Sequence, residues 1–296
     1  MWKEFLEWAE VYREPFIQAV TFVKYESTAK IIHDHFGEKT INEIQRRDLQ
    51  MFFNTLSIKY QKLTIKTIYQ QILAFYQSLV DEGDLDRNLM NGIRFSGVEK
   101  DKKRKFMEVE EVELLIKALD LTDRRDVMIY TSLKTGLRFA EVLGITPGDL
   151  YEQGGLYMVK IDKTLDYKYT HEFKTTKTKS SIRDISITTD MFNLLNGWAG
   201  AHCVPEGQSI LGSCPSATVN RRLEILCEEI GIPPISFHGL RHTHGSLLIR
   251  QGIPVISVSK RLGHADTVVT QKIYIHLLEE QEKEDNLEIV KLLEAI

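Results

Sequence analysis

Apolar residues recur at helical spacing through the first hundred residues. This spacing runs through WKEFLEWAEVYREPFIQAV, residues 2–20, and through LTIKTIYQQILAFYQSLVDEG, residues 63–83. Thr64 is a candidate N-cap for the second segment, and Gly83 marks its end. Aromatic side chains on such stripes are usually buried, so we interpret them as core rather than as a base-stacking platform. The pattern predicts a small all-helical module over residues 1–97.

The periodicity breaks at GVEKDKKRKFME, residues 97–108, where basic residues crowd together without an apolar stripe. We interpret residues 98–106 as a basic interdomain linker. A solvated tether and a segment that contacts phosphates are equally compatible with this composition. If the linker contacts phosphates, the candidate residues are Lys102, Lys103, Arg104 and Lys105.

Residues 107–278 combine helical patterns with a short β-rich insert. EVEEVELLIKALD and DRRDVMIYTSLKTG have helical spacing. LYMVKID (156–162), THEFKT (170–175) and IRDISIT (182–188) alternate polar and apolar residues and are rich in β-branched side chains. Helical patterns return after the insert. The predicted fold class is mainly α with a small antiparallel β-sheet, divided into an all-helical first domain and a mixed α/β second domain.

The amino-acid composition excludes few classes of protein. The 296 residues are 43% hydrophobic and 27% charged, and the net charge is -4. The tail, residues 279–296, holds seven acidic residues against two basic ones, so the remaining body carries a charge of +1. This balance is compatible with a basic cleft that binds nucleic acid. The three cysteines form no CxxC pair, no apolar run reaches a membrane span, and the first residues include acids, so we expect a cytoplasmic protein without membrane association.

The stretch FHGLRHTHGSLLIRQG, residues 237–252, concentrates titratable chemistry on one helical pattern. His238 and Arg241 are three residues apart and therefore share a helix face. His238 and His242 could form half of a metal site, but the sequence supplies no HExxH glutamate and no nearby cysteine cluster, so we expect no metal. We interpret His242 and His244 as residues that support the fold.

Two further segments carry comparable residues. TSLKTGLRFAEVLGI places Arg138 just after Gly136, with Glu141 one turn later, and RLGHADTVVTQKIYIHL contains His264 and Tyr274. The ordered set TGLRxxE, HxLRH, LGH and a tyrosine followed by IHL resembles the tyrosine recombinase family, which includes integrases of phages and integrative elements. The resemblance covers residues 107–278, and the preceding helical module resembles the core-binding, DNA-clamping domain of that family.

The resemblance implies roles for individual residues. Arg138 and Arg241 resemble the two catalytic arginines, His238 and His264 the two histidines that flank the scissile phosphate, and Tyr274 the nucleophile. Two arginines can bind phosphate oxygens through several hydrogen bonds and stay protonated. They can therefore take the place of the metal ions that many nucleases use, and we expect no cofactor.

Two supporting residues complete the implied site. Glu141 is similar to the acidic residue that buttresses the first arginine. The family also uses a lysine on a β-hairpin, and KTTKTKSSIRDISI resembles this hairpin. Lys177 is our choice for this lysine, with Lys174 and Lys179 as alternatives.

The implied function is site-specific DNA recombination through a 3′-phosphotyrosyl intermediate, in the integration or excision of a mobile element. The implied partners are double-stranded DNA attachment sites, three further copies of the chain in a tetramer on DNA, and an accessory DNA-bending protein. The implied location is the bacterial cytoplasm or nucleoid. A non-cleaving DNA-binding regulator and a type IB topoisomerase-like enzyme are the alternatives. Residues 279–296 are expected to form a tail helix that docks on a neighbouring protomer or packs on its own domain.

Overall fold

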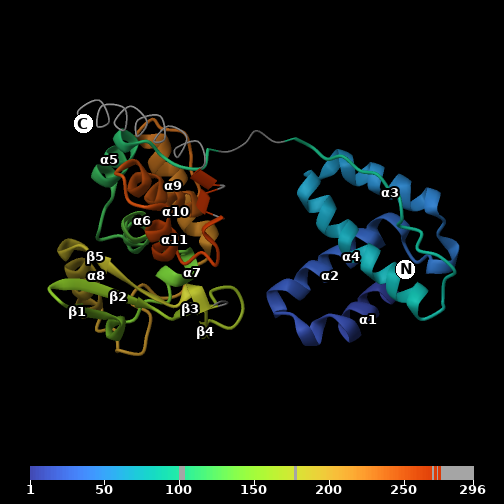
Figure 1. The fold of residues 1–296 in the computed structure, drawn as a ribbon, viewed down its shortest axis with the longest axis horizontal. Helices are drawn as coiled ribbons and strands as arrows, with labels where there is room; N and C mark the ends of the chain where they lie inside the picture. The colour runs from blue at the N-terminus through green and yellow to red at the C-terminus, as the bar shows by residue number, and fades with distance from the viewer. Residues whose placement is uncertain (100–103, 177–178, 269, 272, 275–296) are drawn as a thin grey trace, which may run out of the picture. The chain divides into compact units, whose positions relative to one another are not determined.

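The computed structural model describes residues 1–99, 104–176, 179–268, 270–271 and 273–274, and not the side chain of Lys179 (Figure 1). The chain divides into two compact units, Met1–Lys102 and Lys103–Ile296, each with its own hydrophobic core. The predicted fold class, mainly α with small antiparallel sheets, is confirmed. Among the described residues, no helix has the length and apolar character that crossing a membrane would need.

The Met1–Lys102 unit is all-helical in its described part. Its elements are α1 (Trp2–Tyr12), η1 (Glu14–Phe16), α2 (Ala19–Phe36), η2 (Ile41–Glu43), α3 (Arg46–Lys59) and α4 (Lys62–Asp81). Phe5, Trp8 and Phe75 are buried, and the Phe75 ring centroid lies 5.6 Å from each of the other two. Such aromatic pairs stabilise a core beyond their buried area. The prediction that these aromatics form core is confirmed.

The predicted N-cap of α4 is wrong. The helix begins at Lys62 with Gln61 in the N-cap position, so Thr64 lies within the first turn. Gln61 has extended backbone angles and provides no side-chain cap, which is why no capping signal marks this start. The end of the helix was predicted more closely, because α4 ends at Asp81 and Gly83 follows with φ of +85°.

The Lys103–Ile296 unit mixes helices and strands. Its elements are α5 (Val109–Ala118), α6 (Arg124–Thr135), α7 (Phe139–Val142), η3 (Pro147–Asp149), β1 (Leu150–Gln153), β2 (Leu156–Ile161), β3 (Lys163–Leu165), β4 (Phe173–Thr175), η4 (Lys179–Ser181), β5 (Arg183–Ile187), α8 (Thr189–Ala201), α9 (Ser216–Glu229), α10 (Phe237–Arg250) and α11 (Val255–Leu262). The three predicted strands correspond to β2, β4 and β5. The sequence patterns did not indicate β1 or β3.

The strands form two small antiparallel sheets. One has the order β1-β2-β5, and Val159 pairs with Ile185 across its centre. Both side chains are buried in the core of the unit. The other is the hairpin of β3 and β4, in which Lys163 pairs with Thr175. The central strand β2 thus presents its alternate apolar residues to the helices.

Two helix ends position the residues that matter below. α6 ends at Gly136, which has the left-handed φ of +73° that favours glycine, and the chain then turns directly into α7. The N-cap of α10 is Ser236, whose hydroxyl accepts a hydrogen bond from the Gly239 amide over 3.2 Å. α10 packs against both α6 and α11. The turn between α6 and α7 therefore lies directly before Arg138, and the first two turns of α10 lie beside it.

Candidate active site

Residues from three separate chain segments meet here: the α6–α7 junction, α10 and the end of α11. Nη1 of Arg241, on α10, donates to the carbonyl of Gly136 over 2.8 Å. Its Nη2 donates over 2.5 Å to the carbonyl of Leu262, the last residue of α11. Nη2 of Arg138 donates over 3.2 Å to the carbonyl of Gly263. These hydrogen bonds bring both predicted arginines and the turn before His264 into one cluster.

Arg138 occupies the N-cap position of α7 and is fixed by Glu141. The Arg138 backbone N–H donates to one carboxylate oxygen of Glu141 over 2.9 Å, and Nη1 donates to the other over 2.7 Å. Glu141 is almost completely buried, and burial alone would raise its pKa. Hydrogen bonds from Arg183 and the charges of Arg183 and Arg138 outweigh that effect and lower the pKa. Arg138 itself keeps 37% of its side chain exposed, so it remains accessible to a ligand.

Arg241 is buried, with 1% of its side chain exposed. Its Nη1 lies 4.0 Å from the Glu141 carboxylate, which also faces Arg138. Burial and the charge of Arg138 lower the pKa of Arg241 to about 9, so the guanidinium is still charged at neutral pH. An anion bound between two such arginines would relieve their mutual repulsion and receive charge-assisted hydrogen bonds. The cluster therefore suits a phosphate group.

The two predicted histidines are held neutral at pH 7. Removal from water and the charges of Arg241 and Arg138 lower the pKa of His238, and the same causes lower that of His264 to about 4. Nδ1 of His264 lies 2.7 Å from the Thr270 hydroxyl. A neutral imidazole can accept a proton, so both side chains suit proton transfer near an anion.

Tyr274 lies against α10, and its hydroxyl is hydrogen-bonded within the protein. The side chain is fully buried beside Ile249, Val258 and Leu262. The hydroxyl donates a hydrogen bond to the carbonyl of His242 over 3.2 Å. Burial raises the pKa of Tyr274 to about 12, although the charge of Arg241 acts in the opposite direction. In this conformation the phenol is neutral.

The predicted basic residues have different environments. Lys102, Lys103 and Lys177 lie outside the described residues. On β4, Lys174 pairs with Asp166, at 2.5 Å between Nζ and Oδ2. Arg104 pairs with Glu111 at 2.5 Å. Lys105 is exposed, and its charge contributes to a lowered pKa of His242.

A family model described as the phage integrase family matches residues 105–281, and one described as its N-terminal SAM-like domain matches residues 3–57. The chain belongs to the phage integrase family. The resemblance drawn from the four sequence motifs is thereby confirmed.

Relatives of this integrase-family chain include a XerC-like tyrosine recombinase of Caldanaerobacter subterraneus. It is 28% identical over 297 residues, which cover 88% of the chain and 75% of the relative. The ICEBs1 integrase of Bacillus subtilis is 28% identical over 275 residues, covering 86% and 73%.

Solved structures with the same fold include the Tn1549 transposon integrase in complex with a circular intermediate DNA. Its TM-score is 0.74 at 14% identity, with 96% of this chain and 98% of that chain covered. XerH site-specific recombinase bound to a palindromic difH substrate gives a TM-score of 0.65 at 18% identity, covering 92% and 80%. At these identities the likeness shows the fold.

Sequence reasoning missed Arg183, and it interpreted His244 as a residue that supports the fold. Arg183 binds Glu141, and His244 lies between α6 and α11. A signal for Arg183 exists: it is two residues before buried Ile185 on β5, and residues in that phase face the same side of a strand. A charged residue in phase with core residues indicates a buried ion pair. The buried position of His244 agrees with its interpretation as a residue that supports the fold.

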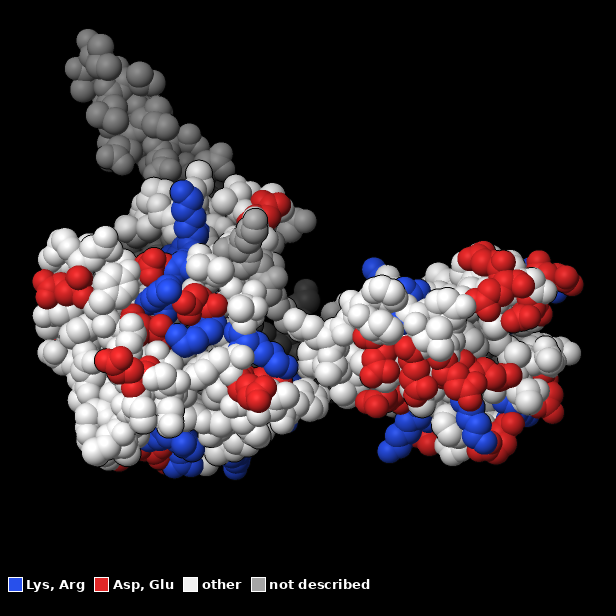
Figure 2. All heavy atoms as spheres, turned by 90° about the horizontal axis from the view of Figure 1, so that it is seen from below, with Lys and Arg blue, Asp and Glu red and all other residues white. Residues whose placement is uncertain are grey.

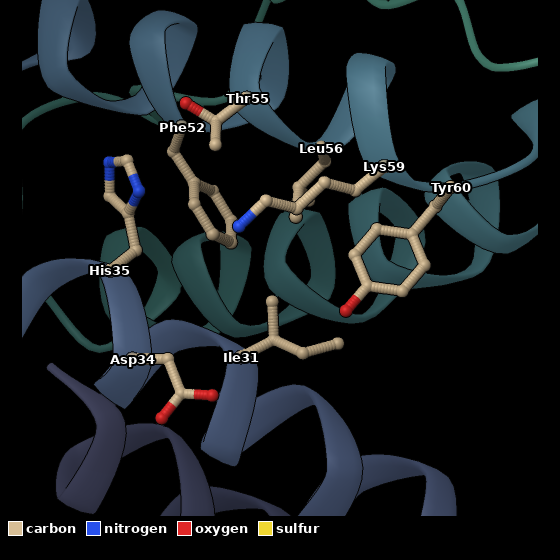
Figure 3. A pocket seen from close by; sticks show the side chains of 8 residues that line it. All are labelled: Ile31, Asp34, His35, Phe52, Thr55, Leu56, Lys59 and Tyr60. Carbon is tan, nitrogen blue, oxygen red and sulfur yellow. The ribbon is translucent and has the colours of Figure 1, made fainter.

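Surface charge and a pocket of the Met1–Lys102 unit can be compared with the arginine cluster. Figure 2 shows Lys and Arg atoms in a band across one face of the Lys103–Ile296 unit, interspersed with acidic atoms. The Met1–Lys102 unit has a pocket between α2 and α3, lined by His35, Asp34 and Lys59 among mostly apolar side chains (Figure 3). Burial, with the charges of Lys59 and Lys39, lowers the pKa of His35. With one acid opposite one lysine, this pocket offers an anion much less charge than the arginine cluster.

Proposed function

We propose that this chain is a site-specific DNA recombinase that integrates or excises a mobile element. The observation that supports this most directly is the arrangement of Arg138 and Arg241 around Glu141, within electrostatic reach of the Tyr274 phenol. A phosphodiester already carries one negative charge, and in-line attack adds charge to its nonbridging oxygens. Preorganised guanidinium groups stabilise this charge more than they stabilise the ground state.

The proposed reaction conserves the energy of the phosphodiester bond. The Tyr274 oxygen attacks phosphorus, the bond from phosphorus to the 5′ oxygen breaks, and a 3′-phosphotyrosyl bond forms. His238 is the proposed acceptor of the phenol proton, and Lys177 is the proposed donor of a proton to the departing 5′ oxygen. His264 hydrogen-bonds the phosphate. Attack by a 5′ hydroxyl of another strand reverses these steps, so rejoining needs no external energy source and no cofactor.

Tyr274 must move before it can react. Its hydroxyl is buried and donates to the His242 carbonyl in the free protein. Attack on a phosphate therefore requires this hydrogen bond to break and the phenol to leave the apolar cluster. We assign this step to assembly on DNA.

We propose double-stranded DNA attachment sites as the substrate, with four copies of the chain assembled on them. Residues 1–97 and 107–278 would clamp the duplex, joined by the basic linker 98–106. The structures of the Tn1549 integrase and XerH contain DNA, which supports DNA as the substrate. The tail, residues 279–296, lies outside the described residues, and we propose that it docks on a neighbouring protomer. An accessory DNA-bending protein would assist assembly. The proposed location is the bacterial cytoplasm or nucleoid.

Covalent trapping on nicked duplexes tests the proposal. Duplexes tiled from the DNA flanking the gene of this chain are incubated with protein and resolved on denaturing gels. We expect an adduct that Tyr274→Phe abolishes and that the exposed control Tyr169→Phe retains. Binding without any adduct on matched DNA would favour the non-cleaving regulator instead. Relaxation of supercoiled DNA without site preference would favour the topoisomerase-like enzyme.

A further inference from the structure

Arg183 makes more contacts to the site than its place on β5 suggested. Its Nη1 and Nη2 donate to the two carboxylate oxygens of Glu141, over 3.3 and 3.1 Å. Nε donates to the carbonyl of Arg261 over 2.6 Å, and Nη1 also donates to the carbonyl of Ser181 over 2.9 Å. Only 8% of the side chain is exposed. The guanidinium therefore donates its hydrogen bonds to the protein rather than to solvent.

The turn before His264 is held between two arginines. Arg183 binds the carbonyl of Arg261, and Arg138 binds that of Gly263. A Cβ added to Gly263 would lie 2.7 Å from Nη1 of Arg183, so the backbone of this turn packs directly on the guanidinium. Gly263 also has the left-handed φ of +67°. Arg241 also binds the Leu262 carbonyl, so displacement of Arg183 would remove one of three arginine contacts that hold this turn.

The same side chain sets the charge of the cluster. Three guanidinium groups, those of Arg138, Arg183 and Arg241, face the single carboxylate of Glu141. The cluster therefore carries an excess of two positive charges. A phosphodiester attacked by a phenolate reaches two negative charges in its five-coordinate state. Without Arg183, the buried carboxylate would draw more strongly on the two remaining arginines and would bind a proton more readily.

We propose that Arg183 is a positioning residue for strand transfer: it keeps Glu141 ionised and holds Arg138 and the His264 turn in their relative positions. This rests on the proposed function. In this role Arg183 acts through Glu141 and the turn before His264 rather than directly on the phosphate. A lysine could not replace it fully, because one ammonium cannot bridge both carboxylate oxygens and two carbonyls in a fixed plane.

The test compares Arg183→Lys and Arg183→Gln with Arg222→Lys. Arg222 is a matched control, because it binds buried Asp126 through two hydrogen bonds of 2.8 and 2.7 Å in the same unit but away from the cluster. Single-turnover adduct formation is measured at saturating nicked duplex across pH, with DNA affinity and thermal unfolding measured in parallel. We expect both Arg183 variants to slow adduct formation by roughly 10- to 100-fold, with DNA affinity unchanged within a few-fold. Arg222→Lys should retain the wild-type rate.

The pH profile separates positioning from a merely structural role. Loss of Arg183 should allow Glu141 to protonate at higher pH, so the acidic limb of the rate profile should move to higher pH in Arg183→Gln. A rate that falls equally at all pH values, or falls equally in Arg222→Lys, would overturn the inference. So would wild-type kinetics in Arg183→Lys, which decides the outcome if Arg183→Gln does not fold. If the wild-type chain itself forms no Tyr274-dependent adduct, the proposed function fails and the inference falls with it.

Discussion

The hydroxyl of Tyr274 occupies space that exists only because Gly245 has no side chain. A Cβ added to Gly245 would lie 2.2 Å from the hydroxyl oxygen, closer than any real contact. The glycine lies in the middle of α10, where glycine is otherwise unfavourable by roughly 0.5–1 kcal/mol relative to alanine. Gly245 thus makes the buried position of the phenol possible.

Gly245→Ala should expel Tyr274 from this position. We expect nitration of Tyr274 by tetranitromethane, located by peptide mass spectrometry, to become several-fold faster in the variant. We also expect the free energy of unfolding to fall by about 1 kcal/mol or more, because overpacking outweighs the helix preference of alanine. Gly197→Ala in α8 is the matched control: it has open space around it and should be neutral or stabilising. Equal nitration of wild type and Gly245→Ala would contradict the buried position.

Arg138→Lys and Arg241→Lys should reduce activity to a similar extent, but only Arg241→Lys should reduce stability. Removal of one preorganised donor typically costs about 3–4 kcal/mol of transition-state stabilisation, so Arg138→Lys and Arg241→Lys should each slow adduct formation by roughly 100- to 1000-fold. Arg241→Lys should also lower the free energy of unfolding by about 1–3 kcal/mol, because two buried carbonyls lose their donor. Arg138→Lys should spare stability, and urea titration of both variants measures this difference. Equal destabilisation would contradict the difference in burial.

His244 should make the larger unit sensitive to acid. Its Nδ1 lies 3.0 Å from the carbonyl of Leu133 and must carry the proton, while Nε2 accepts a hydrogen bond from Nε of Arg261 over 2.9 Å. Burial and the charge of Arg261 lower the pKa of His244 to about 3 from the ordinary 6.5. Between these two pKa values His244 binds a proton in the unfolded chain but not in the native state. The free energy of unfolding therefore falls as the pH falls through this range.

The expected contribution of His244 is about 1.4 kcal/mol per pH unit in that window. Urea titrations at pH 7 and pH 5 measure it. His244→Gln keeps a donor and an acceptor but does not titrate, and it should lose part of the acid sensitivity. An unchanged difference between the two pH values in His244→Gln would assign the sensitivity to other groups.

Gly136→Ala should destabilise more than alanine at another left-handed glycine. Both Gly136 and Gly252 have positive φ, +73° and +76°. A Cβ at Gly136 would also meet His244 and Leu262 at 2.7 Å, whereas Gly252 has open space. We therefore expect Gly136→Ala to lower the unfolding free energy by about 1–3 kcal/mol more than Gly252→Ala does. Equal losses of unfolding free energy in the two variants would mean that His244 and Leu262 move aside without destabilising the protein.

Helices and strands with a local periodic pattern were predicted from the sequence. Strands that depend on contacts with distant residues were not. Helical periodicity identified α4, and alternation identified β2 and β5. The strand β4 is as short as β3 but was predicted from the segment THEFKT, whereas β1 and β3, of four and three residues, were not predicted. Their hydrogen-bond partners, not their own side chains, determine them.

Sequence motifs named residues for the candidate site but did not predict how they are arranged. Motif order indicated Arg138, Arg241 and Tyr274, and the structure brings both arginines to one carboxylate. The burial of Tyr274 was not predictable, because it depends on a glycine 29 positions earlier on another helix. The Arg183 contact to Glu141 spans 42 positions and has the same long-range origin.

The order of the site residues along the chain has a consequence during translation. The arginines are held by carbonyls of Gly136, Leu262 and Gly263, all of which are synthesised before Tyr274. A ribosomal product that stops short of Tyr274 therefore retains the arginines proposed to bind phosphate without the proposed nucleophile. Such a fragment, if it folds, would occupy a recombination site without cutting it and would act as a dominant inhibitor of the complete chain.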